Sequence, residues 1–230
     1  MAPAADDVDA PDQPAAAAVP APGTSAWYQR QAPLPGGRWQ VRCLFSDDHP
    51  DGTTVEGDEE LPGRFEIWRA DLDDQRRPRL RVSPDAAPGS PTMWFVALPE
   101  LQDARPAMTL VGYEHDVVEP GVVVPDATFF HLPTRSRDQV GAIRWWRDEA
   151  VVDQVYVGEG FRRRHVATAL IYAASAYHQL HGWPGRLHSD GRRTSMGEHL
   201  VAGLRHPDRI AALDRLMPPM DPDGSVTRSD

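Results

Sequence analysis

The clearest pattern of apolar and polar positions lies in the second half of the chain, where a strand pattern runs directly into a helix pattern. Residues 151–157 are largely apolar on both faces, which is typical of a central strand covered on two sides. From Val166 to Leu180, apolar residues recur at the spacing of one buried helical stripe, and Gly182 follows as a typical stop. The chain therefore predicts a strand, a turn with three arginines and an amphipathic helix in succession.

Shorter patterns predict a strand-rich remainder. Strands are expected at residues 38–45, 64–70, 79–82, 93–98, 108–113, 127–132, 140–146 and 185–189, with turns rich in glycine, proline and aspartate between them. The strand at 140–146 forms a hairpin with the strand at 151–157. Residues 194–204 predict a last helix that Thr194 or Ser195 caps. Residues 39–113 are either an extension of one fold or a separate β module.

Composition divides the chain of 230 residues into four parts. Residues 1–24 contain almost no large apolar side chain, so we expect a disordered N-terminus. Residues 25–126 form a β-rich N-terminal region, and residues 127–204 form the core around the strand and helix. Residues 205–230 are a tail rich in proline and aspartate, with one short helix expected at residues 208–216.

Charge and cysteine content narrow the class of protein. Aspartate and glutamate (34) outnumber lysine and arginine (24), which argues against binding to nucleic acid or to an anionic membrane. The chain lacks a secretory signal and a stretch of transmembrane length, and its single Cys43 suits a reducing cytoplasm. The acidic runs at residues 47–51 and 56–60 lack EF-hand spacing, so we expect no metal site.

The basic turn at residues 158–165 is the best candidate for a binding site. A strand that opens onto a helix aims backbone N–H groups and the positive end of the helix dipole at one point, and the arginines add charge there. This arrangement predicts phosphate binding. A dinucleotide-binding or P-loop site is excluded, because the third glycine of the first motif and the Gly-Lys-Ser/Thr of the second are missing.

This segment resembles the coenzyme A-binding signature of the GNAT superfamily of N-acetyltransferases, as a divergent variant of phage or actinobacterial type. The matching residues read Val157-x-x-x-Phe161-Arg162-x-x-His165-Val166-Ala167-x-x-Leu170. The resemblance covers residues 128–204 and implies a GNAT-like mixed sheet with a central strand–turn–helix crossover, preceded by a β-rich extension. It also implies acetyl-CoA as co-substrate, with the pyrophosphate on the turn. The residues implied to bind it are Val155, Val157, Arg162, Arg163, Arg164, His165, Val166, Ala167 and Thr168.

The sequence departs from the family signature at two positions. Glu159 stands where proline is usual, and His165 stands where glycine is usual. A β-carbon at position 165 makes the approach of a phosphate harder. A helical backbone does not itself require glycine, so His165 is expected to donate its N–H and, when protonated, to add a positive charge.

Transfer of an acetyl group to an amine needs a base and an acid. The tyrosine that serves as acid in the family, on the final helix, is missing here. The candidates near the expected cleft are Tyr156, Asp153, His188, Ser189 and Glu149. We therefore expect an N-acetyltransferase acting on a small-molecule or protein amine. The alternatives are an inactive GNAT-like protein, or an accessory protein of a phage or mobile element, either of which would bind a partner through the β-rich N-terminal region.

Overall fold

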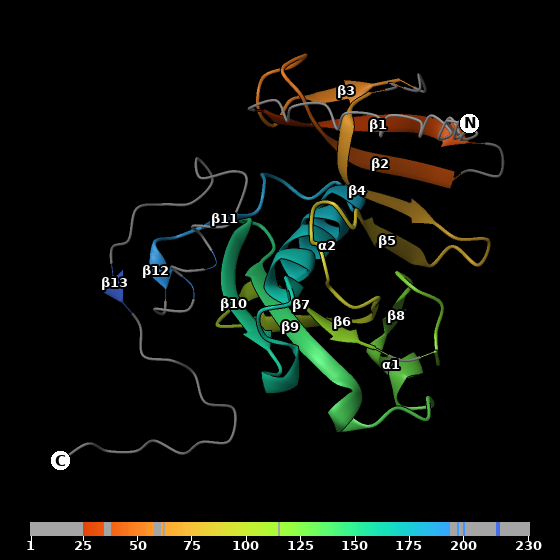
Figure 1. Cartoon of the computed structure of the whole chain (residues 1–230), viewed down its shortest axis with the longest axis vertical. Coiled ribbons are helices and arrows are strands. Elements are labelled where there is room, and N and C mark those ends of the chain that lie inside the picture. Colours follow the sequence, from red (N-terminus) through yellow and green to blue (C-terminus); the bar gives the residue numbers. More distant parts are fainter. Residues whose placement is uncertain are drawn as a thin grey trace, which may run out of the picture.

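The computed structural model describes residues 25–34, 38–57, 61, 63–114, 116–193, 197, 200 and 215–216. In this part, the chain is a mixed α/β protein with two mixed sheets and few helices (Figure 1), which confirms the expected fold class at this level. The elements, in chain order, are β1 (Ala26–Leu34), β2 (Arg38–Phe45), β3 (Thr54–Glu56), β4 (Phe65–Leu72), β5 (Pro78–Val82), β6 (Trp94–Gln102), β7 (Arg105–Tyr113), β8 (Val123–Pro125), α1 (Asp126–Phe129), β9 (Gln139–Trp146), β10 (Val151–Val157), α2 (Val166–Leu180), β11 (His188–Ser189), β12 (Arg192–Arg193) and β13 (Arg215–Leu216). Single 3-10 turns precede β9 and follow β10.

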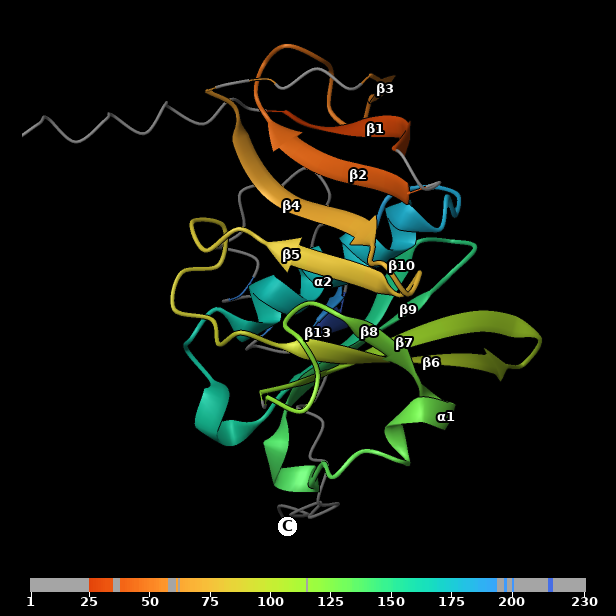
Figure 2. The same cartoon turned by 90° about the vertical axis from the view of Figure 1, so that its right-hand side faces the viewer.

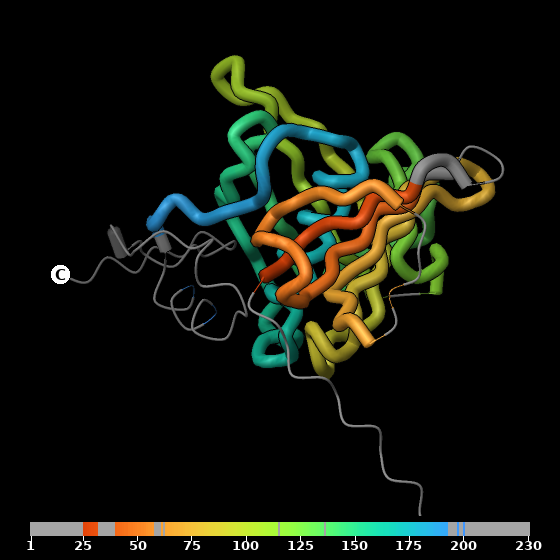
Figure 3. The backbone as a smooth tube through the Cα atoms, turned by 90° about the horizontal axis from the view of Figure 1, so that it is seen from above, coloured from red at the N-terminus to blue at the C-terminus, as the bar shows by residue number. Residues whose placement is uncertain are grey.

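The first sheet has the strand order β3-β1-β2-β4-β5. The predicted strands at 38–45, 64–70 and 79–82 are confirmed as β2, β4 and β5, which pair antiparallel. The sequence pattern does not predict β1, because this strand buries polar side chains beside its aromatic ones. Gln29 is buried and accepts a hydrogen bond of 2.6 Å from Nε of Arg42 on β2. Viewed from above, the strands of this sheet, coloured red to yellow, lie side by side (Figure 3).

The second sheet has the strand order β11-β10-β9-β7-β6-β8. The expected strands at 93–98 and 108–113 are confirmed as the hairpin β6–β7, and the hairpin β9–β10 is confirmed as well. The boundary between the sheets falls between β5 and β6, so β6, β7 and β8 of the N-terminal region share a sheet with β9 to β11. β10 is second from the edge of its sheet and none of its side chains is fully buried, so it is not the doubly covered central strand that was expected.

One predicted strand is wrong. Residues 127–132 form the short helix α1 and a turn, not a strand. Asp126 begins this helix, and its carboxylate accepts a hydrogen bond of 2.7 Å from the N–H of Ala127. Phe129 then packs its ring against Trp94 and Tyr113 on the face of the second sheet that is turned away from α2. Packing of the partly buried Phe129 ring against the second sheet therefore outweighs the strand preference of this segment.

Helix α2 lies between the two sheets, with β2, β4 and β5 on one side and β7, β9 and β10 on the other (Figure 2). Its expected bounds are confirmed, but the expected single apolar stripe is wrong, because side chains are buried all around the helix. The buried residues are Val166, Thr168, Ala169, Leu170, Tyr172, Ala173, Ala174, Ser175, Ala176, Tyr177, His178 and Gln179. Most are small, so strands approach the helix from both sides, as around a core helix of a larger protein.

The two sheets meet at their edges as well as across α2. Arg79 of β5 forms an antiparallel bridge with Val122, next to β8, and the N–H of Leu80 donates a hydrogen bond of 2.8 Å to the carbonyl of Gly121. Arg79 also forms an ion pair with Glu119. The backbone therefore continues from one sheet edge to the other, and the strands curve around α2.

Three predicted features fall on residues that the structure does not describe. These are the N-terminal segment 1–24, most of the helix expected at 194–204, and most of the tail at 205–230. In the tail, residues 215–216 are described as β13, which pairs parallel with β12, so this end of the helix expected at 208–216 is a strand. Cys43 is buried in the core, as its position among apolar residues predicts.

Candidate functional site

The segment between β10 and α2 is a turn held firmly at its start. The N–H of Gly158 donates a hydrogen bond of 2.9 Å to the carbonyl of Val140 on β9, and the N–H of Phe161 donates one of 2.9 Å back to Gly158. The ring of Phe161 packs against the hydrophobic core. These contacts fix where the chain leaves the sheet, so the next residues begin from a defined position beside the first turn of α2.

A run of unpaired backbone N–H groups follows. The first hydrogen bond of α2 runs from the N–H of Ala169 to the carbonyl of His165, at 2.9 Å. Within the described chain, no hydrogen bond is recorded from the N–H groups of residues 163–168. Successive N–H groups without a partner at a helix N-terminus are the kind of donors that bind an anion in proteins.

Two residues of the turn have left-handed backbones. Arg163 has a φ of 62° and His165, at the start of α2, has a φ of 52°. This conformation is costly for a residue with a β-carbon, on the order of 1 kcal/mol or more each. Position 165 was expected to have a helical backbone, which does not require glycine; its backbone instead lies in the left-handed region that glycine favours.

The three arginines of the turn are exposed. No ion pair of Arg162, Arg163 or Arg164 with another described residue is recorded, and the guanidinium of Arg164 lies 5.6 Å from the centre of the Phe161 ring. The formal net charge of the chain is −10. Free cationic groups beside free N–H groups are therefore a local positive site on an acidic protein, which suits a small phosphorylated ligand better than a nucleic acid.

Strand β10 leads away from this turn with one open edge. β11 pairs with β10 only at Val151 and Val152, and no other described strand pairs with this edge. A bulge separates Val152 from Gln154 at the same level, in the pairing with β9. Among the described strands, none pairs with the backbone of residues 154–157 on the side away from β9. Val155 and Val157 pack against the core on the α2 face, so Tyr156 between them faces the opposite side.

Asp153 lies in the bulge and is held by an ion pair. Its carboxylate is 3.2 Å from the guanidinium of Arg144 on β9, and both side chains are mostly buried. Arg144 also lies 3.1 Å from Glu100 of β6. Two carboxylates, one from β10 and one from β6, therefore share this arginine of β9. Asp153 is committed to this network, which makes a structural role more fitting for it than proton transfer.

The other catalytic candidates are spread along the strand. His188 and Ser189 lie on β11 beside Val151 and Val152, five or six residues of β10 away from the turn, which is roughly 17–20 Å. Nδ1 of His188 bonds the carbonyl of Arg186 at 3.0 Å, and Oγ of Ser189 accepts a hydrogen bond of 3.3 Å from the N–H of Gly191.

Glu149 lies in the turn before β10 and is exposed. Its carboxylate is 2.6 Å from the guanidinium of Arg105 at the start of β7. This surface ion pair joins the β9–β10 turn to the β6–β7 hairpin. Such a pair contributes little stability, and it occupies the carboxylate that was a candidate base.

Sequence patterns do not reveal the backbone geometry of the turn. Arginine has no preference for the left-handed region, so nothing in the sequence identifies Arg163 as a residue with a positive φ. The chain matches no protein-family model, no curated protein and no solved structure among those compared. No described helix is both long enough and apolar enough to span a membrane.

Proposed function

We propose that the chain is an acetyl-CoA-dependent N-acetyltransferase whose coenzyme site is the turn between β10 and α2. The observation that carries the proposal is the run of free N–H groups at residues 163–168, bordered by three exposed arginines. A pyrophosphate matches both the donors and the charge. The strand–turn–helix order and the resemblance of this segment to the GNAT signature support the same ligand.

The open edge of β10 suits the rest of the coenzyme. The pantetheine arm carries two amide groups, which pair with a strand edge as a peptide does. Residues 154–157 offer such an edge, and the bulge at Asp153 lies at its far end. An arm bound along this edge brings the thioester toward the bulge and β11.

Transfer then needs groups that move two protons. The thioester supplies the acetyl group; the amine nitrogen forms a bond to the acetyl carbon while the carbon–sulfur bond breaks. In this proposal the hydroxyl of Tyr156 donates a proton to the departing thiolate, and solvent accepts the proton that the amine loses. The backbone of β10 orients the thioester, so the protein contributes mainly positioning.

The competing function is binding without transfer. It is favoured by the ion pair that engages Asp153 and by the ion pair that engages Glu149. In this case the turn still binds a phosphorylated ligand, and the two functions differ only in whether acetyl transfer follows.

Calorimetric titration of the full chain with coenzyme A tests the site. Ala167→Asp places a carboxylate among the free N–H groups, and Ala167→Asn is its matched neutral control. Two charges 4 Å apart near a protein surface interact by about 4 kcal/mol. We therefore expect Ala167→Asp to weaken binding at least tenfold more than Ala167→Asn, with both proteins folded, because a negative charge is tolerated in the first helical turn. Equal affinities of the two variants contradict the assignment.

Acetyl transfer to a panel of amines then separates the two functions. Tyr156→Phe retains the ring and removes only the hydroxyl. If Tyr156 is the acid, this variant binds coenzyme A as the unmodified chain does and loses most of the transfer rate, on the order of a hundredfold. Coenzyme binding without transfer by the unmodified chain supports the binding protein instead.

A further inference from the structure

The face of the first sheet that is turned away from α2 is polar. Alternate residues of its strands, such as Tyr28, Val41 and Trp68, belong to the core that packs on α2. The residues between them therefore point to the opposite face. One row of these residues crosses four strands in register, at Gln29 on β1, Arg42 on β2, Arg69 on β4 and Arg81 on β5. The arginine row is the name used below for Arg42, Arg69 and Arg81.

Positive charge exceeds negative charge along the arginine row. Like charges directly opposite one another on neighbouring strands are destabilising. Two carboxylates on the same face offset part of this repulsion: that of Glu66 lies 2.7 Å from the guanidinium of Arg69, and that of Asp71 lies 2.7 Å from the guanidinium of Arg81. Nε of Arg42 donates a hydrogen bond of 2.6 Å to a neutral glutamine side chain of β1. Three guanidinium groups and two carboxylates make this row formally positive, on a chain whose net charge is −10.

Part of this face is buried. Gln29, Gln31, Gln40 and Arg42 are each between 3% and 8% exposed. Among the described helices, α2 packs on the other face of this sheet, and α1 packs on β6 and β8. Polar side chains on the outer face of an antiparallel sheet are normally solvated. Their burial indicates that more than the described helices and strands covers this face.

An acidic segment of the same chain is joined to this sheet. Residues 1–24 contain four aspartates, at positions 6, 7, 9 and 12, and neither lysine nor arginine. Residue 25 directly precedes β1, the first strand that the row crosses. From position 12 to position 25, an extended chain spans up to roughly 40 Å. The arginine on β5 is three strands from β1, or about 14 Å. The aspartates can therefore reach every arginine of the row.

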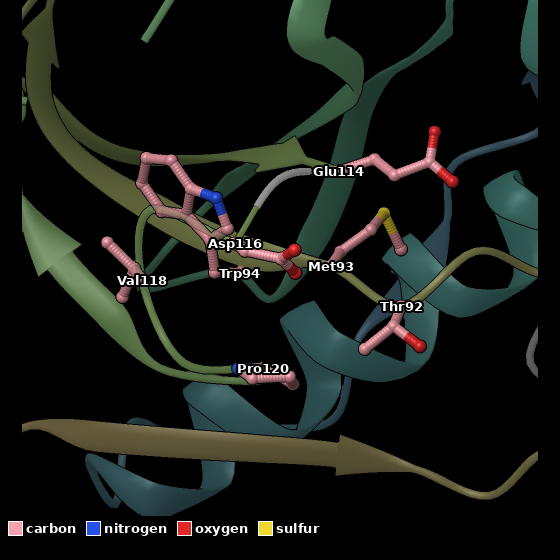
Figure 4. A pocket seen from close by; sticks show the side chains of 7 residues that line it. All are labelled: Thr92, Met93, Trp94, Glu114, Asp116, Val118 and Pro120. Atoms are coloured by element: carbon pink, nitrogen blue, oxygen red, sulfur yellow. The ribbon is translucent and has the colours of Figure 1, made fainter. Parts of the chain in front are cut away.

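The cavity of the second sheet has the opposite charge. It has a volume of about 380 Å³ and lies where β6 begins and β7 ends (Figure 4). Its two charged lining residues, Glu114 and Asp116, are carboxylates. An acidic segment is repelled there, so the residues at this cavity serve as a reference for the test below.

We propose that residues 1–24 dock on the outer face of the first sheet, with their aspartates on the arginine row. The carboxylates accept charge-assisted hydrogen bonds from the guanidinium groups. The prolines of the segment keep it from forming a helix, which suits an extended segment lying across strands. Because the segment is tethered to β1, its effective concentration at the row is in the millimolar range. The docking does not depend on the proposed coenzyme site, since the two share no residue.

Paramagnetic relaxation enhancement in the full chain tests this contact. Val8→Cys places a nitroxide label between two aspartates, and Cys43 is buried and so does not react. At low salt, we expect the amide signals of the arginine row to lose at least half of their intensity relative to the reduced label. The signals of the residues that line the cavity should keep theirs. The loss should disappear at about 1 M salt, where the Debye length is about 3 Å.

Two sets of substitutions show whether the aspartates cause the contact. The first set removes the four carboxylates of the segment together and should abolish the loss of signal: Asp6→Asn, Asp7→Asn, Asp9→Asn and Asp12→Asn. The matched control removes three carboxylates from the acidic run between β3 and β4 and should retain the loss: Asp58→Asn, Glu59→Gln and Glu60→Gln.

Four results overturn the proposal. The row keeps its signal with the label in place, the four asparagines leave the loss unchanged, or the control abolishes it as well, which attributes it to overall charge. In the fourth, the strongest loss falls on residues 162–164, which assigns the segment to the basic turn. A loss on unlabelled chains mixed with labelled ones overturns it too, because the segment then binds a second copy. Coenzyme A is absent throughout, so failure of the coenzyme proposal has no bearing on this result.

Discussion

The histidine at the centre of α2 leads to a prediction on how stability depends on pH. His178 is fully buried between the sheets. Its Nδ1 accepts a hydrogen bond of 3.2 Å from Nε1 of Trp145 on β9, and its Nε2 lies 3.0 Å from the carbonyl of Pro184. Both bonds are satisfied only by the neutral ring with its proton on Nε2. A second proton on Nδ1 would face the N–H of Trp145.

Burial lowers the pKa of His178 below 6.5, although the bond to the Pro184 carbonyl opposes this. A lowered pKa means that the unfolded chain takes up the proton first as the pH falls. The contribution to stability is therefore complete above pH 6.5 and is lost as the pH falls toward the folded-state pKa. If the folded ring stays neutral, the free energy of unfolding falls by about 1.4 kcal/mol between pH 7.5 and 5.5 on account of this residue.

Urea denaturation at the two pH values measures this loss. His178→Gln is the matched variant, because a glutamine amide also offers an acceptor to Trp145 and a donor to Pro184 but does not titrate. We expect it to be less stable by about 1–2 kcal/mol at pH 7.5 and to lose about 1.4 kcal/mol less than the unmodified chain on acidification. His188→Gln, on an exposed strand, serves as a control. If the unmodified chain and His178→Gln lose the same free energy, the proposed protonation linkage is refuted.

Two further predictions concern the backbone. His165→Gly should raise the free energy of unfolding by about 1 kcal/mol, because it removes a β-carbon from a left-handed residue. Arg76→Gly is the control: Arg76 has a φ of 61°, so this variant should gain the same stability. Only His165→Gly should change the affinity for coenzyme A. Gly141→Ala should cost about 1–3 kcal/mol, because its β-carbon would overlap the carbonyl oxygen of Tyr156 and lie 3.0 Å from Leu170. Gly160→Ala, where no atom lies within 4 Å of the β-carbon, should leave the free energy of unfolding nearly unchanged. Thermal denaturation of the four variants and the unmodified chain measures these differences.

The sequence predicts elements better than it predicts their surroundings. The bounds of α2 and of β2 follow from local periodicity, which reports which residues share a face. Local periodicity does not report how many partners an element has. The alanines of α2, at residues 173, 174 and 176, fit both an amphipathic helix and a helix buried on all sides, and only the second sheet decides between them.

The candidate site also has features that the sequence predicts and features that it does not. The sequence predicts the order of strand, basic turn and helix, and the free N–H groups follow from that order. The left-handed residues 163 and 165 and the ion pair of Asp153 with Arg144 depend on contacts between separate strands.

The central position of α2 has a consequence for synthesis of the chain on the ribosome. The strands of the first sheet end at residue 82, but the helix that covers them is completed only at residue 180. At roughly 5–20 residues per second, the apolar side of β2, β4 and β5 waits several seconds or more for its covering. The nascent chain therefore exposes an apolar, aggregation-prone surface during this interval. Chains cut short before residue 166 should be targets for chaperones and proteases, since they lack the helix that covers this surface.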